Sequence, residues 1–137
     1  MILITHMLLA AATAKLIENP ILAIILAFLS HYLLDFIPHA EYNHKKIKYI
    51  FIDFVLGLII IFILAKNPFI TYACMFFALI PDGFTLLDII SNRKNFVWHD
   101  NFHRRKLHFF KHKKISNFWR IFSQVLIGFF SIIALLL

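Results

Sequence analysis

Histidines and aspartates recur in this apolar sequence at spacings that suit metal coordination. His31 and Asp35 are four residues apart, and His99 and His103 repeat that spacing. On a helix, side chains four residues apart point the same way. Imidazole nitrogens and carboxylate oxygens are usual ligands of zinc, so we expect a divalent-metal site and zinc as its metal. The candidate ligands are His6, His31, Asp35, His39, Asp82, His99 and His103.

Each of these pairs has a simpler interpretation when it is taken alone. A histidine four residues from an acid commonly forms a hydrogen-bonded pair on a helix surface. Asp53 could pair with a nearby lysine or hydrogen-bond His31, and Asp88 could cap a helix end. A metal is favoured because several such residues are expected at one depth of the same structure.

Five apolar runs must position these residues. The 137 residues are 61% hydrophobic, with a mean hydropathy of +0.81. A soluble domain of this size cannot bury so much apolar surface. We therefore expect an all-α fold: one domain, residues 1–137, forming an integral membrane bundle of about five transmembrane helices. The predicted helices are 2–17, 21–37, 47–65, 69–90 and 118–137, of which the first two are short for a bilayer.

Two local features modify this bundle. Pro81 precedes Asp82 and predicts a kink or break that would aim the carboxylate inward. Residues 91–117 are basic, and Trp98, Phe102 and Phe109 recur at helical spacing. This segment is therefore expected to form an amphipathic helix in the headgroup region, as a lid over a site or as a basic anchor.

The distribution of positive charge predicts the orientation. With alternating helices, every Lys and Arg except Lys15 and Lys66 falls on the side that holds the N-terminus. By the positive-inside rule, the N-terminus is then cytoplasmic and the C-terminus outside, in a multi-pass protein of the inner (plasma) membrane. The net charge of +7 is assigned to an anionic membrane surface and not to nucleic acid, because the basic residues flank apolar runs. A cleaved signal peptide is the competing interpretation of the N-terminus, but no Lys or Arg precedes its apolar run.

All eight histidines, and every acid except Glu18, fall on that same side. The predicted topology depends on Lys and Arg alone, so this clustering is independent of it. A carboxylate facing lipid at mid-bilayer costs about 2.5–3.5 kcal/mol. The deeper acids should therefore face the bundle interior and one another.

Three short motifs are similar to those of a known family. Thr5-His6, Ser30-His31-x-x-x-Asp35 and Leu79-x-Pro81-Asp82 resemble elements of the small bacterial inner-membrane proteins classed as metal-dependent hydrolases. The chain lacks that family's H-R-G-x-T-H-S element, and the order of its elements differs. The resemblance implies a reaction class and no particular substrate.

The hypothesis that follows is a membrane-embedded, metal-dependent hydrolase. Asp35 or Asp82 would act as general base or ligand, and Arg104 and Arg105 would hold a phosphate. The substrate would be a phospholipid or another phosphoester amphiphile with its head group at the cytoplasmic face. Two alternatives stay open: a protein for ion or small-solute transport, whose path a homo-oligomer could complete, and a non-catalytic membrane scaffold.

Overall fold

The computed structural model describes residues 3–39, 47–91, 96–102 and 115–137. Six helices and no strand form in this part of the chain, so the all-α expectation is confirmed. The helices are α1 (Leu3–Leu16), α2 (Pro20–Phe36), α3 (Ile47–Leu64), α4 (Pro68–Ile90), α5 (Val97–Asp100) and α6 (Asn117–Leu136).

Each predicted apolar run forms one helix, with ends that differ by one residue at most. The start of α2 shows why. The Asn19 side chain accepts hydrogen bonds from the backbone N–H groups of Ile21 and Leu22, at 3.0 and 3.1 Å, and Pro20 occupies the first helical position. A side-chain cap and a proline at this position are both typical of a helix start.

Two of the described helical segments, 68–88 and 117–136, are long and apolar enough to cross a membrane. The apolar helices α1 and α2 are shorter, with 14 and 17 residues. The finer expectation, that five helices cross the bilayer, stays a prediction.

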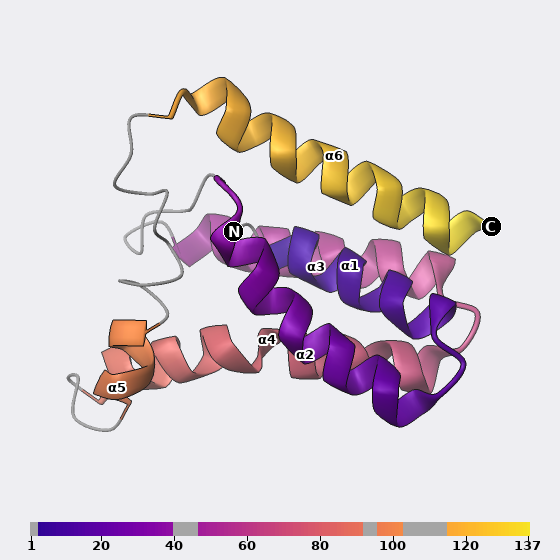
Figure 1. Cartoon of the computed structure of the whole chain (residues 1–137), viewed down its shortest axis with the longest axis horizontal. Helices are drawn as coiled ribbons and strands as arrows, with labels where there is room; N and C mark the ends of the chain where they lie inside the picture. Colours follow the sequence, from indigo (N-terminus) through magenta and orange to yellow (C-terminus); the bar gives the residue numbers. More distant parts are fainter. Residues whose placement is uncertain (1–2, 40–46, 92–95, 103–114) are drawn as a thin grey trace.

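The long helices alternate in direction along the chain. Helices α1, α3 and α6 begin at one end of the bundle, and α2 and α4 end there. The C-terminus lies at the other end (Figure 1). We call the first of these the polar end. The predicted histidine and aspartate ligands on α1, α2 and α4 belong to it.

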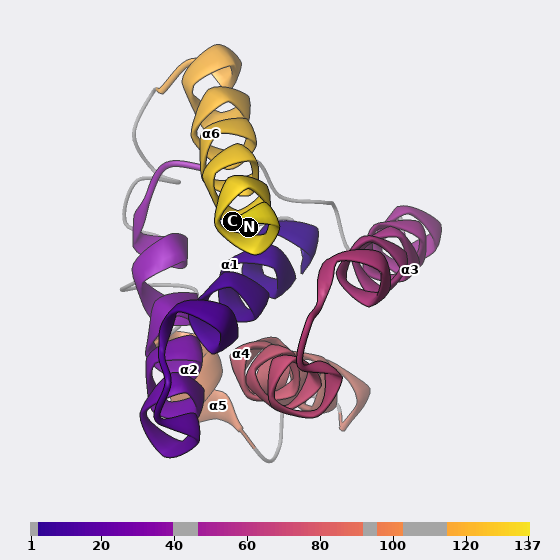
Figure 2. The ribbon, with the colours of Figure 1, turned by 90° about the vertical axis from the view of Figure 1, so that its right-hand side faces the viewer.

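Helix α1 is the centre of the bundle. It packs against α2, α3, α4 and α6 (Figure 2). Ala10, Ala11, Ala12 and Ala14 are all buried, and such small side chains let neighbouring helices approach on several sides. Gly57 on α3 provides another close approach, because an added Cβ there would lie 2.8 Å from Met7 Cε. Side chains of α1 therefore contact neighbouring helices on several sides.

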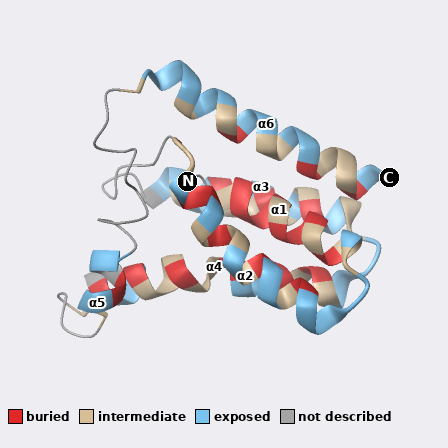
Figure 3. Cartoon of the chain, viewed as in Figure 1, coloured by how far each residue is buried: buried red, intermediate tan, exposed pale blue. Residues whose placement is uncertain are grey.

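The outer helices expose large apolar side chains. On α6, Phe129 and Phe130 are exposed, whereas Gln124, Ser131 and Leu135 are buried. The exposed faces of the outer helices contrast with the buried α1 in Figure 3. The apolar surface of this bundle is thus turned outward as well as inward.

Two sequence expectations concern the polar end. Helix α4 runs through Pro81 from Pro68 to Ile90, so the proline does not break it. Within the segment predicted to form an amphipathic helix, the described residues include the four of α5 and a π-type turn at residues 101–102. Residues 92–95 and 103–114 of that segment, Phe109 among them, lie outside the described residues, so the amphipathic helix stays a prediction.

Candidate metal centre

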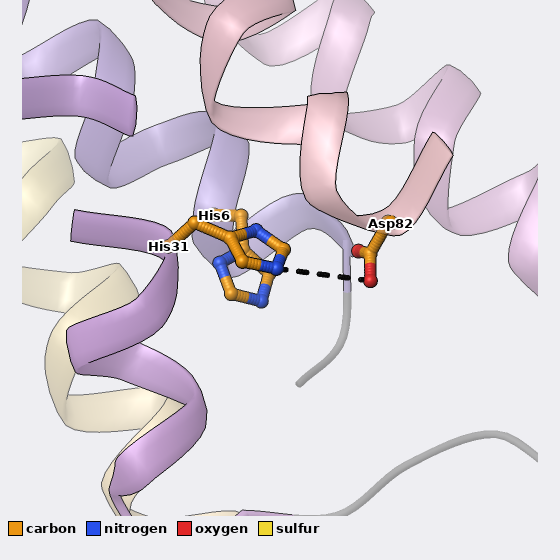
Figure 4. Close-up of side chains that lie close together, drawn as sticks. All are labelled: His6, His31 and Asp82. Atoms are coloured by element: carbon orange, nitrogen blue, oxygen red, sulfur yellow. Dashed lines mark ion pairs between the residues drawn. The ribbon is translucent and has the colours of Figure 1, made fainter. Parts of the chain in front are cut away.

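Three helices bring histidine and aspartate side chains together at the polar end. His6 comes from α1, His31 and Asp35 from α2, and Asp82 from α4. Single ligand atoms of His6, His31 and Asp82 all lie within 4.8 Å of one another, which is close enough to hold a metal ion. Figure 4 shows the two imidazoles together, with the Asp82 carboxylate beside them. The imidazole rings are stacked, with centroids 4.2 Å apart and planes inclined by 22°.

Asp35 lies against both of these imidazoles. One carboxylate oxygen is 3.3 Å from His6 Nε2, and the other is 3.0 Å from His31 Nε2. The four-residue spacing on α2 therefore aligns His31 and Asp35 as predicted. The same His31 nitrogen is also 3.8 Å from Asp82 Oδ1.

His39 follows the end of α2 and reaches the same carboxylate. Its Nε2 lies 3.9 Å from Asp35 Oδ1, and its Nδ1 lies 2.6 Å from the Ile37 carbonyl oxygen. The Pro38 carbonyl oxygen accepts a hydrogen bond of 2.6 Å from Ser123 Oγ, so α6 fixes the segment that carries His39.

The separations between donor atoms fit a bound metal ion. Metal–ligand bonds of about 2.0–2.2 Å in a tetrahedral site separate the ligand atoms by about 3.3 Å. The distances from the Asp35 carboxylate to His31 and His6 are 3.0 and 3.3 Å, and the distance from His31 to Asp82 is 3.8 Å, so all three lie near that value. The longer two exceed the range of about 2.7–3.2 Å for N–H···O hydrogen bonds. The 3.0 Å contact also suits a hydrogen bond, so the metal-binding geometry rests on the group of His6, His31 and Asp82.

Burial makes a cation more favourable still. The side chains of His6 and His31 are fully buried, and that of Asp35 is 1% exposed. Among the described residues, neither nitrogen of His6 makes a hydrogen bond. Polar groups buried without such partners are costly, and a metal ion satisfies them. With neutral imidazoles, the two carboxylates carry a charge of −2, which one divalent ion balances.

Asp82 differs from the other three in its exposure. Its side chain is 34% exposed, against 1% for Asp35. The cluster is thus enclosed on the α1–α2 side and open beside Asp82. Catalytic metal sites keep a position open for water or substrate, and this is the side on which one would be reached.

The other predicted site residues lie elsewhere or are not described. His99 is buried on α5, where its ring contacts Phe84 and Trp98, and it is not a member of the group that could hold a metal. His103, Arg104 and Arg105 lie outside the described residues. That these three residues bind metal or substrate stays a prediction.

Two other buried acids have a different role. Asp53 Oδ2 accepts a hydrogen bond of 3.1 Å from the backbone N–H of Ile4, so this side chain caps the start of α1. Asp88 Oδ1 accepts one of 2.9 Å from the N–H of Phe96 and ties α4 to α5. The capping role considered for Asp88 agrees with this contact, whereas the cap on α1 and the Ser123 contact were not foreseen. No signal in the sequence marks either, because both depend on which helices become neighbours.

Comparisons of the chain with protein-family models, with curated proteins and with solved structures find no match. The resemblance to membrane metal-dependent hydrolases therefore stays a prediction that depends on its three short motifs.

Proposed function

We propose that this protein is a membrane-embedded, metal-dependent hydrolase. The observation that supports it most is the convergence of His6, His31, Asp35 and Asp82 from three helices. Two imidazoles and two carboxylates form a ligand set that zinc accepts, and we expect zinc to be the metal. Such an ion activates water and polarises the group to be cleaved.

The exposure of the carboxylates divides their roles. Asp35 is buried between imidazoles, so it holds them in place and serves as a ligand. Asp82 lies at the open side, where its free oxygen could accept a proton from an attacking water. We therefore assign Asp82 as the general base and Asp35 as the ligand that organises the site.

The proposed substrate is a phospholipid or another phosphoester amphiphile. The cluster is at one end of an apolar bundle whose outer helices expose large apolar side chains. An amphiphile could therefore keep its chains in lipid while its head group reaches the cluster. Arg104 and Arg105 would hold the phosphate, because guanidinium groups pair with that anion through two hydrogen bonds.

The proposed setting is the inner membrane, with five spanning helices and the polar end in the cytoplasm. The positive-inside rule supports the orientation, and the exposed apolar faces support the lipid environment. Short helices such as α1 and α2 can be accommodated by local thinning of the bilayer.

The test is cleavage of lipid by the purified, zinc-loaded protein in vesicles of phosphatidylethanolamine and phosphatidylglycerol. We expect water-soluble phosphoester products, and His31→Ala should lower the rate at least about tenfold because a ligand is lost. Asp88→Asn is the matched control: it changes a buried acid on α4 that caps a backbone N–H, and its rate should stay near that of the parent.

Two results would favour the alternatives. Metal-loaded protein that cleaves no phosphoester, but conducts ions across the vesicle in a manner dependent on Asp82, would indicate transport. Protein that binds no metal and loses only stability in His31→Ala would indicate a scaffold whose polar cluster locks α1, α2 and α4 together.

A further inference from the structure

Gly83 lies in the interior of α4, directly after the candidate ligand Asp82. A glycine inside a helix is destabilising relative to alanine, and one use of it is to let another group approach the backbone closely. Gly57 on α3 has such a neighbour in Met7. At Gly83, an added Cβ would meet no atom of the described residues within 4 Å. The packing of the described chain therefore does not account for this glycine, which borders open space.

The two flanks of α4 differ at this level. On one flank, the ring of Phe84 contacts that of His99, so α5 covers it. Gly83 lies on the other flank, four residues after Leu79, which packs against the core cluster that includes Ile61 of α3. Helix α3 packs against α1 and makes little contact with α4 within the described residues (Figure 2). The flank that carries Gly83 is therefore the open one.

An apolar surface continues from Gly83 along this flank. Leu79 and Phe76 precede Gly83 by four and seven residues, so all three share one face of the helix. Leu79 is partly buried, and Phe76 is 65% exposed. Because α4 ends at the polar end, both side chains lie farther from that end than Asp82 does. Apolar surface thus leads from the exposed Asp82 carboxylate towards the middle of the bundle.

We propose that the acyl chain of an amphiphilic phosphoester binds on this open flank, across Gly83 and along Leu79 and Phe76. This inference rests on the proposed hydrolase and names the position that selects its substrate. Methylene groups can pack closely on the backbone of α4 where no side chain is present. The phosphoester attached to such a chain then lies beside Asp82, on the open side of the metal cluster.

The experiment compares two substrates in the zinc-loaded, full-length parent and in Gly83→Phe. One is dioleoyl phosphatidylglycerol in vesicles, and the other is bis(p-nitrophenyl) phosphate, which is soluble in water and has no acyl chain. The phenylalanine fills the open space and displaces the acyl chain. It should therefore raise KM for the lipid and lower kcat/KM at least about tenfold, because a displaced substrate no longer has its reactive geometry. The rate on the small phosphoester and the zinc content should match those of the parent.

Two alanine variants provide a matched comparison. Gly83→Ala should lower kcat/KM for the lipid in the same direction as Gly83→Phe, but less, and should raise the melting temperature because alanine favours a helix. Gly128→Ala on α6 is the control. An added Cβ there would lie 3.9 Å from Leu8 Cδ1, which is an ordinary contact, and α6 supplies no ligand to the cluster. Its lipid kinetics should match those of the parent. If Gly83→Phe fails to fold, Gly83→Ala and Gly83→Leu decide the question.

The outcomes separate this inference from the proposed function. A parent that cleaves both substrates, with Gly83→Phe equal to it on the lipid, would overturn the acyl-chain site and leave the hydrolase intact. An equal loss on both substrates at normal zinc content would make Gly83 part of the cluster's own geometry and would also overturn it. A parent that is dimeric in detergent, together with a monomeric Gly83→Phe that keeps its lipid kinetics, would assign the flank to a second copy of the chain. A parent that cleaves neither phosphoester would overturn both proposals.

Discussion

Four aspartates at the polar end divide into two pairs by what their oxygens face. Asp53 and Asp88 accept hydrogen bonds from backbone N–H groups at the start of α1 and before α5. Asp35 and Asp82 face imidazole nitrogens. Both pairs include carboxylates that are buried in an apolar bundle, yet the first pair completes helix ends and the second meets side chains that bind metals.

Burial of an acid does not by itself mark a functional site. A carboxylate that caps a helix has its cost of burial offset by backbone N–H groups and by the helix dipole. A carboxylate surrounded by imidazoles has its cost of burial offset to the same degree only when the imidazoles donate protons to it or a cation is bound. Of these four aspartates, only Asp35 and Asp82 bear on the metal hypothesis, so variants of the two pairs should behave differently.

The largest difference is expected for Asp35→Asn. The amide keeps the size of the side chain but removes the charge that faces three imidazoles, so metal affinity should fall by more than about 100-fold. Competition with a chromophoric chelator measures it. Asp88→Asn is the matched control and should bind metal like the parent; equal losses in both variants would make the two pairs of acids equivalent.

A smaller effect is expected for His6→Gln. One of two stacked imidazoles is lost while Asp35, Asp82 and His31 remain, so metal affinity should fall by about 10–100-fold. The same titration reports it. His99→Gln removes another buried imidazole, which lies outside the group, and should leave the affinity unchanged. If the His99 variant were the weaker binder, the metal would have to be sought near α5.

The smallest effect on metal binding is expected for Asp53→Ala. Loss of the cap on α1 should lower the free energy of unfolding by about 1 kcal/mol, because a backbone N–H loses its partner. Metal affinity should stay within about twofold of that of the parent, which corresponds to a change of under about 0.5 kcal/mol in the free energy of binding. Denaturation in detergent measures the first quantity, and Asp53→Asn, which keeps an oxygen for the cap, should lose less. A variant of normal stability that binds no metal would place Asp53 in the second pair.

Much of the fold could be predicted because apolar runs and their breaks are local signals. Asn19 and Pro20 mark the start of α2 in the sequence as clearly as in the structure. The pattern of apolar runs does not predict that α1 lies at the centre of the bundle. Its small residues between Ala10 and Ala14 are the local signal that indicates close contact on several sides. Hydrophobicity alone would not place α1 at the centre, because α1 is the least apolar of the long helices.

The site was predictable where depth and helical spacing decide it. His6, His31, Asp35, His39 and Asp82 share one depth, and the structure brings them together. His99 shares that side of the chain but is packed against Phe84, because spacing alone does not fix the position of a segment outside the bundle. The contacts of Asp53 with Ile4 and of Ser123 with Pro38 join residues far apart in the chain, so only the packing of helices reveals them.

Whether this cluster binds a metal is decided by the metal content of the purified protein. The full-length protein, isolated in detergent without chelators and incubated with zinc, should retain at least one zinc ion per chain after dialysis. Asp35→Asn, prepared in the same way, should retain almost none. A parent chain that retains no zinc, or one that retains no more than Asp35→Asn does, would show that the cluster is not a metal site.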